Sequence, residues 1–428
     1  MQLWTKLREE LVCGALNERL QSVYGCAPSK LPEKGQRLLK LMDAFAGAFG
    51  AEGQVGLFSG PGRTELGGNH TDHQHGCVLA AAVDLDAIAC AGANGTSRVH
   101  ILSDGYPDID IDLDDLKPHE QERETSAALV RGIAAKMREM GYQVGGFNAY
   151  ISSNVLGGSG LSSSAAYEVL MGVIFNHLFC GDKLTMVEVA QIGQYAENVF
   201  FGKPCGLMDQ LTSAVGGVVS IDFADPSAPV VQQVQCDPAA YGYALCIIDS
   251  GASHMDLTAE YAAIPTEMGA VAAFFGKQWL REVEEKDFWN NIQQIRRTAG
   301  DRAVLRAAHF FADNALALEQ RELLQKEDFS GFLGSVNSSG RSSAMYLQNL
   351  SCSNRPNEQA VTITIALAEH ILQGKGAVRV HGGGFAGTVQ TYVPVDMTER
   401  FSDEMEKALG AGCCHFLQIR PVGGAVLA

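Results

Sequence analysis

The spacing of apolar residues along the chain changes between a helical and a strand-like period without a regular repeat. Apolar residues recur at three- and four-residue intervals before residue 48 and over 124–141, 184–201 and 257–325, which predicts helices. Short runs such as FNAYISSNV, VVSIDF, YALCIID and AVRVHGG are typical of strands. Residues 108–115 alternate between acidic and apolar side chains, which predicts a strand with one solvated face. This mixed order favours an α+β fold over a doubly wound sheet.

The size of the chain allows more than one domain. Its 428 residues, 46% of them hydrophobic, are enough for two or three cores. Three prolines lie between residues 222 and 240, where we expect a boundary. We therefore predict an N-terminal domain over 1–225 and a C-terminal domain over 226–428.

The charge balance is acidic, with 49 Asp and Glu against 32 Lys and Arg and a formal net charge of −17. This excludes a general attraction for nucleic acid or anionic membrane, which depends on clustered basic residues. An anionic ligand would have to be bound locally, by backbone N–H groups, a metal ion and a few basic side chains. The 11 cysteines include no CxxC pair, which fits reduced thiols and a cytoplasmic location. The first twelve residues have the pattern of an amphipathic helix rather than a signal peptide, and no membrane span is expected.

A glycine-rich loop, GGSGLSSSAA, follows one predicted strand and opens a predicted helix. Its glycines let the backbone approach an anion, which would meet the N–H groups of the loop and of the helix N-terminus. Its serine hydroxyls could bind phosphate oxygens or magnesium. The loop is neither a Walker loop nor a dinucleotide fingerprint, and a serine-rich helix cap is the alternative. The predicted cofactor-binding residues are Gly157, Gly158, Ser159, Gly160, Leu161, Ser162, Ser163 and Ser164.

A second segment, GPGRTELGGNHTDHQHGC at 60–77, concentrates hydrogen-bonding side chains between glycines. We expect a loop that recognises a polyhydroxylated ligand, because each hydroxyl needs a donor and an acceptor. Arg63 could counter the charge of a transferred phosphoryl group. The three histidines with Asp72 could instead hold a transition metal, although their spacing does not match a helical ligand pair.

A third segment, AENVFFGKPCGLMDQL, places Glu197 on a predicted helix and Asp209 beyond a turn. One carboxylate can hold magnesium while the other accepts a proton from, or orients, an attacking hydroxyl. The structural alternatives are a solvated helix face for Glu197 and a helix N-cap for Asp209. A fourth segment, VHGGGFAGT at 380–388, indicates either backbone pressed against a partner or a glycine-rich hairpin.

In order and spacing, these four segments resemble the motifs of the GHMP kinase superfamily, and its galactokinase branch most closely. GLSSSAA matches the superfamily phosphate loop, CGLMDQ is similar to the galactokinase segment CGxMDQ, and GGGFAG to the motif GGGFxG. Residues 62–73 resemble the sugar signature GRxNLIGEHxDY. The resemblance implies a ribosomal-S5-domain-2-like N-terminal domain and a ferredoxin-like C-terminal domain. It further implies a galactokinase-type reaction, in which ATP and Mg²⁺ serve to phosphorylate the anomeric hydroxyl of galactose.

The resemblance also implies a role for each matching residue. Asp209 would be the catalytic base or orienter, and Arg63 would stabilise the reacting phosphoryl group. Ser164 and Glu197 would bind magnesium. The sugar pocket would be lined by Asn69, His70, Asp72, Gly206 and Tyr261.

The sugar signature departs from the family pattern at four positions: Glu65 replaces Asn, Gly67 replaces Ile, Asn69 replaces Glu and His73 replaces Tyr. In galactokinases the Glu that Asn69 replaces lies near the 6-hydroxyl of the sugar. A neutral Asn would remove a like charge facing a 6-carboxylate, so a galactose relative such as galacturonate becomes a hypothesis, with arabinose and fucose as further candidates.

Two other classes of function stay open. The chain could be a catalytically lapsed regulator that binds sugar and ATP, or a kinase of another superfamily acceptor such as mevalonate or homoserine. The intact serine loop and Asp209 favour an enzyme, and CGLMDQ favours a sugar acceptor. We expect a small-molecule partner, no nucleic acid or membrane, and a monomer or a weak homodimer.

Overall fold

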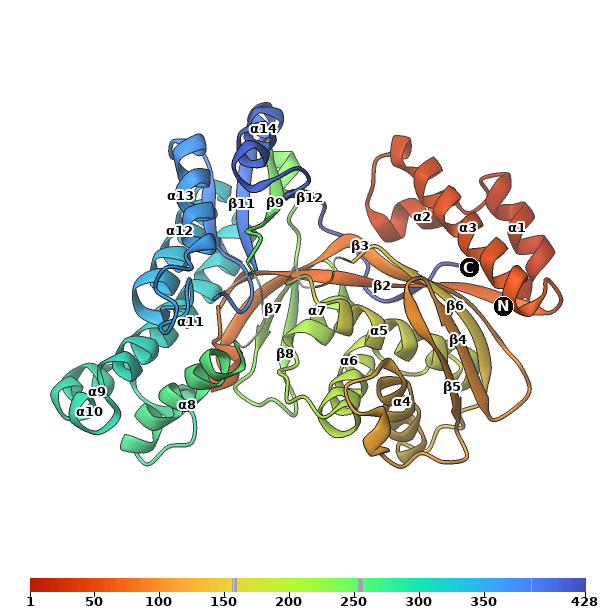
Figure 1. The fold of residues 1–428 in the computed structure, drawn as a ribbon, viewed down its shortest axis with the longest axis horizontal. Helices are drawn as coiled ribbons and strands as arrows, with labels where there is room; N and C mark the ends of the chain where they lie inside the picture. The colour runs from red at the N-terminus through yellow and green to blue at the C-terminus, as the bar shows by residue number, and fades with distance from the viewer. Residues whose placement is uncertain (156, 158–159, 253–256, 386) are drawn as a thin grey trace.

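The computed structural model describes residues 1–155, 157, 160–252, 257–385 and 387–428. Within these residues the strands form two separate sheets (Figure 1). The first has the order β1-β2-β3-β6-β4-β5. In addition, β7 pairs with the first residues of β3, β8 pairs with β7, and β13 pairs with β2. The second has the order β10-β11-β9-β12 and is antiparallel throughout. Mixed sheets and helices without a βαβ repeat confirm the α+β prediction.

The strands of the first sheet are β1 (Gln2–Leu3), β2 (Gln54–Gly67), β3 (Cys77–Ala93), β4 (Arg98–Ser103), β5 (Tyr106–Asp112), β6 (Phe147–Ser153), β7 (Val218–Asp222), β8 (Val230–Val234) and β13 (Ala425–Val426). Those of the second are β9 (Tyr243–Asp249), β10 (Ala377–Val380), β11 (Thr388–Pro394) and β12 (Cys414–Leu417). The alternating acidic segment is strand β5, as predicted.

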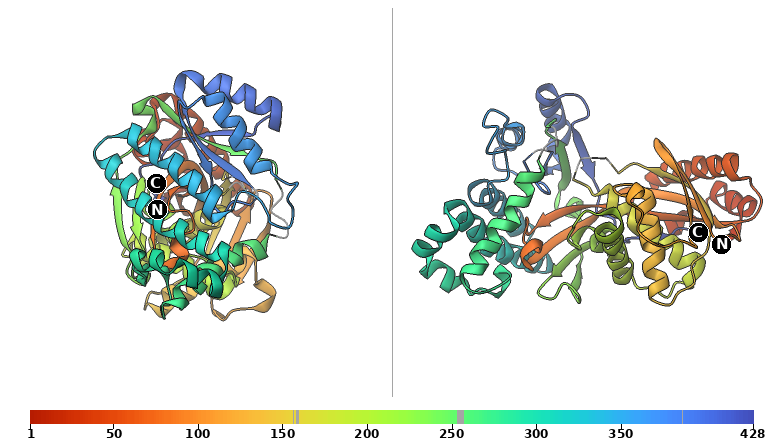
Figure 2. Two further views of the ribbon diagram at one scale, coloured as in Figure 1. Left: turned by 90° about the vertical axis from the view of Figure 1, so that its left-hand side faces the viewer. Right: turned by 60° about the horizontal axis from the view of Figure 1, so that its bottom comes forward.

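Helices cover the sheets in three groups, which Figure 2 shows from two further sides. At the N-terminal end lie α1 (Trp4–Val12), α2 (Asn17–Tyr24) and α3 (Leu31–Phe49). One face of the first sheet carries α4 (Ser126–Glu139), α5 (Ser163–Phe175), α6 (Met186–Tyr195) and α7 (Met208–Val215). The rest of the chain supplies α8 (Thr258–Phe274), α9 (Glu285–Asn290), α10 (Ile292–Ala299), α11 (Asp301–Gln325), α12 (Phe329–Ser342), α13 (Ala360–Leu372) and α14 (Thr398–Leu409).

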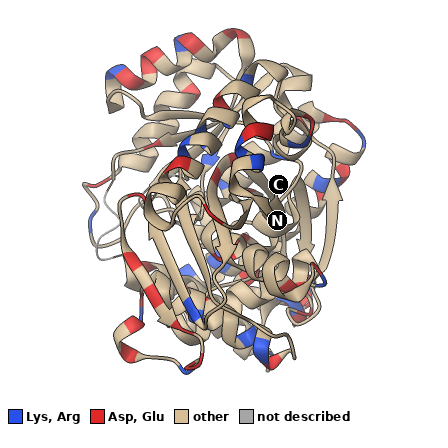
Figure 3. Cartoon of the chain, turned by 90° about the vertical axis from the view of Figure 1, so that its right-hand side faces the viewer, with Lys and Arg blue, Asp and Glu red and all other residues tan. Residues whose placement is uncertain are grey.

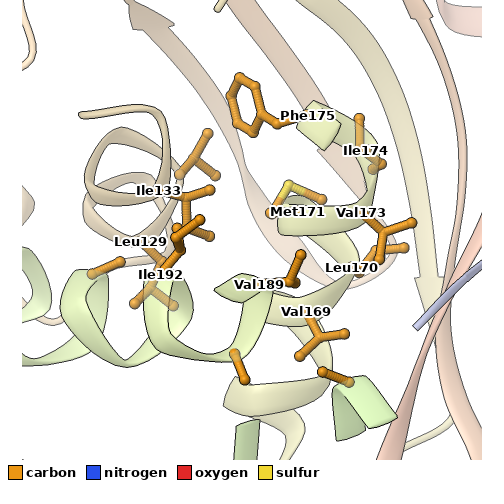
Figure 4. Close-up of a cluster of buried hydrophobic side chains, with 14 of the residues drawn as sticks. Leu129, Ile133, Val169, Leu170, Met171, Val173, Ile174, Phe175, Val189 and Ile192 are labelled. Carbon is orange, nitrogen blue, oxygen red and sulfur yellow. The ribbon is translucent and has the colours of Figure 1, made fainter. Parts of the chain in front are cut away.

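The largest core lies between α4–α7 and the first sheet, and Figure 4 shows α4, α5 and α6 meeting through side chains such as Leu129, Met171 and Ile192. Strand β3 has apolar residues on both faces because different helices cover its two sides. Ala89 faces the core of α4–α7, whereas its neighbour Ile88 faces α1–α3. A strand buried on both faces has a continuous apolar sequence instead of an alternating one, which explains the long run at 77–93.

Strand β2 corrects one expectation. We predicted a loop over residues 60–77, but β2 continues through Gly60 and Pro61 to Gly67. Its pairing with β3 shifts register after Pro61 and again after Glu65, and such bulges are where a strand tolerates proline. Gly60 serves close packing rather than a turn, because a Cβ there would overlap the backbone of α5.

The predicted division of the chain at residue 225 stays a prediction. The strands change from the first sheet to the second between β8 and β9, and the C-terminal β13 returns to pair with β2.

Acidic and basic side chains are interspersed over the face seen in Figure 3. None of the helices in the described part of the chain combines the length and the apolar character needed to cross a membrane.

Candidate active site

Residues 160–162 of the phosphate-loop segment (157–166) lie against strand β2 and lead directly into α5. The backbone N–H of Arg63 donates to the carbonyl of Leu161 at 2.9 Å. Ser162 precedes the helix in the left-handed region, with φ +56°, and its hydroxyl makes no capping hydrogen bond. The loop geometry therefore does not support the alternative of a serine-rich helix cap. Of the predicted cofactor-binding residues, Gly158 and Ser159 lie outside the described residues.

Arg63 and Asp209 form a two-pronged ion pair beneath this loop. Arg63 Nε donates to Asp209 Oδ1 at 2.7 Å, and Nη2 donates to Oδ2 at 2.6 Å. The third nitrogen, Nη1, donates to the carbonyl of Gly160. Arg63 is buried, whereas the Asp209 side chain keeps 31% of its surface exposed. The N-cap of α7 is Leu207, so Asp209 is not a helix cap.

The environment of Asp209 keeps its carboxylate ionised. Burial by itself would raise the pKa of Asp209, but the charge and the hydrogen bonds of Arg63 outweigh burial, with help from the Ser162 hydroxyl. The pKa of Asp209 is therefore below its ordinary value. At neutral pH the site presents a carboxylate that can accept a proton or a hydrogen bond.

A cavity of about 670 Å³ opens beside the start of α5. Ser163, Ser164 and Tyr167 of α5 line one side of it. The other walls come from β5, β6, the end of β4 and the start of α4, and they include apolar groups such as Ile109 and Leu129. An apolar pocket of this size next to a glycine-serine loop has the dimensions of a nucleotide site.

Glu197 lies in a π-helical turn, Ala196–Phe201, that continues α6. Such turns widen a helix and often occur at functional sites. Only 4% of Glu197 is exposed, so the alternative of a solvated helix face is wrong. Its Oε2 accepts a hydrogen bond from Gln210 Nε2 at 2.9 Å, and its Oε1 lies 3.8 Å from Lys203 Nζ.

The donor set fits a magnesium ion. Ser164 and Glu197 offer hydroxyl and carboxylate oxygens, which are the ligand types that Mg²⁺ prefers when it also binds phosphate. The buried Glu197 carboxylate accepts a neutral hydrogen bond on Oε2, while the mostly exposed Lys203 ammonium lies 3.8 Å from Oε1, beyond hydrogen-bond distance, so Oε1 can still receive a cation. These two residues stay the predicted ligands.

Sequence reasoning missed Glu168, a second buried carboxylate beside Glu197. It is fully buried on α5, and its Oε2 also accepts from Gln210 Nε2, at 2.9 Å. Burial first, and the nearby charge of Glu197 second, raise the pKa of Glu168 well above its ordinary value. The available signal was its position, one helical turn after Ser164, which places both residues on the same face of α5.

The predicted sugar residues lie where the first sheet meets the glycine motif of the second. His70, with φ +59°, donates through Nε2 to the carbonyl of Gly383 at 3.0 Å. Burial, and then the neighbouring His73, lower the pKa of His70 to about 4, so its imidazole is neutral at pH 7. The Tyr261 hydroxyl donates to the carbonyl of Gly384 at 2.9 Å.

Asp72 and Gly206 bring two of the motifs into contact. A Cβ placed on Gly206 would lie 2.5 Å from Asp72 Oδ2, so any other residue would displace that carboxylate from this position. The histidines of this segment face different partners: His73 stacks on His70, and His75 stacks on Trp279 with ring centroids 4.2 Å apart. In the part of the chain that the structure describes, no three potential ligand side chains are arranged to hold a metal ion, so the transition-metal alternative has no support.

Asn69 is the predicted sugar residue that the structure places deepest. It is fully buried, and its Nδ2 donates to Glu65 Oε1 at 3.1 Å and to the carbonyl of Gly382 at 2.7 Å. Its Oδ1 accepts from Asn349 Nδ2 at 2.9 Å. Glu65 in turn pairs with the buried Arg379. Asn69 thus belongs to a polar network that joins β2 to the second sheet.

Comparisons with known proteins agree with this architecture. The structure superposes on that of Lactococcus lactis galactokinase complexed with galactose with a TM-score of 0.78, at 24% identity, covering 91% of this chain and 99% of that one. A mevalonate kinase structure gives a TM-score of 0.57 at 14% identity, covering 85% and 99%. Residues 128–217 match the family described as GHMP kinases N terminal domain. The fold is therefore that of the GHMP kinases.

The sequence comparisons identify the branch of the GHMP kinases to which the chain belongs. Residues 43–93 match the galactokinase galactose-binding signature. The galactokinase of Actinobacillus pleuropneumoniae serotype 3 (strain JL03) is 31% identical over 82% of this chain and 89% of its own length. That of Streptomyces coelicolor is 29% identical over 94% of both. The chain belongs to the galactokinase family of GHMP kinases, a family of sugar kinases that transfer a phosphoryl group.

Proposed function

We propose that this protein is an ATP- and magnesium-dependent galactokinase that phosphorylates the anomeric hydroxyl of galactose. The observation that carries the proposal is the Arg63–Asp209 ion pair held under the phosphate-loop segment. It supplies a fixed positive charge and an ionised carboxylate at one point, next to a cavity that can receive a nucleotide. GHMP kinases use ATP as the phosphoryl donor.

In the proposed reaction the sugar hydroxyl attacks the γ-phosphorus of ATP in line with the leaving ADP. Asp209 accepts or orients the hydroxyl proton, while Arg63 stabilises the charge on the transferred group. The N–H groups at the start of α5 face the phosphates. Magnesium, when bound by Ser164 and Glu197, would neutralise charge on the β- and γ-phosphates.

Galactose is favoured over galacturonate by the hydrogen bonds of Asn69. An amide nitrogen has two N–H groups, and both are used, one by Glu65 and one by Gly382. None remains to receive a 6-carboxylate, and the neighbouring carboxylate of Glu65 adds no attraction for one. The hypothesis of an acidic substrate therefore gains nothing from the position of Asn69.

A substrate panel tests the proposal. ADP release would be measured with galactose, galacturonate, arabinose and fucose, and the phosphorylated carbon identified by ³¹P and ¹³C NMR. We expect the highest kcat/KM with galactose and phosphate on the anomeric carbon. A kcat/KM at least tenfold higher with another sugar would identify that sugar, and not galactose, as the substrate.

The lapsed-regulator alternative is separated by comparing the parent with Asp209→Asn. An enzyme loses turnover in the variant while keeping its affinity for sugar. Equal and negligible turnover in both, together with tight sugar binding, would identify a sensor instead.

A further inference from the structure

Three helices bring the side chains of Glu168, Gln210 and Glu197 together, one helical turn along α5 from Ser164. Ser164 and Glu168 occupy successive turns of α5, Gln210 lies in the first turn of α7, and Glu197 lies in the π turn after α6. Gln210 Nε2 donates one hydrogen to Glu168 Oε2 and the other to Glu197 Oε2, each at 2.9 Å. Both hydrogens of the amide nitrogen are thus used to bridge two carboxyl groups.

The space for this bridge is built into the helix packing. Residue 193 of α6 is a glycine, and a Cβ there would lie 3.1 Å from Glu168 Cβ and 3.2 Å from its Oε2. Both Glu168 and Gln210 are at most 1% exposed. A buried carboxyl group is destabilising when its hydrogen bonds are incomplete, and among the described residues Oε1 of Glu168 and Oε1 of Gln210 have no hydrogen-bond partner. An apolar residue would fill the position more cheaply, so stability does not explain the pair.

We infer that Glu168 and Gln210 are positioning residues that fix the Glu197 carboxylate for the magnesium–nucleotide complex. Glu168 anchors the amide of Gln210, and Gln210 in turn holds Oε2 of Glu197. The oxygen that would bind the cation is then Oε1, and the exposed side chain of Lys203, 3.8 Å away, would move aside for it. The inference rests on the proposed ATP- and magnesium-dependent function. Groups that orient a metal ligand from behind usually change metal affinity by about 10- to 100-fold when removed.

The test separates hydrogen bonding from charge and from packing. Glu168→Gln keeps an acceptor oxygen for Gln210, whereas Glu168→Met and Gln210→Met remove the bridge at similar volume. Val189→Ala is the matched control, because Val189 of α6 packs against Gly172 of α5 but takes no part in the bridge. The Mg²⁺ activation constant, kcat at saturating Mg²⁺, the sugar KM and the melting temperature would be measured for each.

We expect both Met variants to raise the Mg²⁺ activation constant by about tenfold or more, with little change in the sugar KM. Glu168→Gln should stay within about threefold of the parent. The double variant Glu168→Met/Gln210→Met should be no worse than either single one, because both break one bridge. Val189→Ala should lower the melting temperature without changing the activation constant.

A second readout does not depend on turnover. Binding of Mn²⁺–ADP to each protein would be measured by Mn²⁺ electron paramagnetic resonance, with the same ranking expected. Unchanged metal affinity in the Met variants, or a loss in Glu168→Gln equal to that in Glu168→Met, would overturn the inference. A parent that retains Mn²⁺–ADP but phosphorylates no sugar would overturn the proposed function alone. A parent that retains no Mn²⁺–ADP would overturn both.

Discussion

Arg63 and Asp209 are 146 positions apart in the sequence, yet two parallel hydrogen bonds of 2.7 and 2.6 Å join the guanidinium to the carboxylate. Paired bonds of this kind fix direction as well as distance. Because Arg63 also holds the carbonyl of Gly160, the pair sets where the phosphate-loop segment lies relative to the proposed base.

Removing the charge of Asp209 is the most direct test of its role. Asp209→Asn should lower kcat by roughly two to four orders of magnitude, the usual contribution of a general base. The Kd for ADP should stay within about threefold, because Arg63 still donates to the carbonyl of Gly160 in the variant. Turnover would be followed by ADP release, and a kcat near that of the parent would mean that the reacting centre lies elsewhere.

Arg63→Lys keeps a positive charge but cannot form the two-pronged pair. We expect kcat to fall by at least about tenfold, because Lys does not replace Arg at a bidentate site. Arg63 lowers the pKa of Asp209, so the weaker pairing should raise that pKa and move the acid limb of the kcat/KM profile to higher pH. An acid limb that stays in place or moves to lower pH would contradict the assignment.

A buried ion cluster near the N-terminal helices predicts acid sensitivity. Burial alone would raise the pKa of Asp86, but Arg37 and Arg420 outweigh burial and lower it to about 2 from an ordinary value of 3.8. A depressed carboxyl pKa stabilises the fold above the ordinary value, and this contribution, about 2 kcal/mol, is lost as the pH falls from 3.8 towards 2. Urea unfolding of the parent and of Asp86→Asn across this range would measure it.

At neutral pH Asp86→Asn should cost about 3–5 kcal/mol, since it leaves buried arginine charge uncompensated. Asp110→Asn is the control, because Asp110 pairs with Arg98 at 2.6 Å on the exposed surface and should matter by less than about 1 kcal/mol. Equal losses of unfolding free energy in the two variants would mean that the buried Asp86 cluster contributes no more than a surface ion pair.

Two glycine-to-alanine changes test why β2 contains Gly60. A Cβ on Gly60 would meet the Ala166 carbonyl and the Leu170 amide, which cannot move aside as a side chain could. Gly60→Ala should therefore cost about 1–3 kcal/mol. Gly47→Ala on the exposed face of α3, where a Cβ meets nothing within 4 Å, should stabilise by up to about 1 kcal/mol. A silent Gly60→Ala in thermal unfolding would mean that α5 packs less tightly on β2.

The sequence predicted the parts of the site whose chemistry is local. The loop before α5 was recognisable because glycine and serine residues cluster within ten positions, and Asp209 because CGLMDQ is similar to a family segment. The fold class followed from the mixture of periods. The roles assigned to the individual residues stay predictions.

What the sequence could not show depends on contacts between distant segments. The glycines and proline of β2 have the composition of a turn, and only the approach of α5 explains them within a strand. Glu197 has the pattern of a surface residue until the π turn and Gln210 enclose it. The position of Glu168 on α5 indicates that it shares a face with Ser164, but it does not reveal Gln210 as its partner, because Gln210 is 42 positions away.

The length of β2 has a consequence for how the two substrates would communicate. The same strand packs on α5 at Gly60, carries Arg63 and, through Glu65, reaches the second sheet at Arg379. A ligand that displaces this strand at either site would therefore also move the residues of the other site. Nucleotide and sugar affinities should then be reciprocally coupled, each changing the other by the same factor.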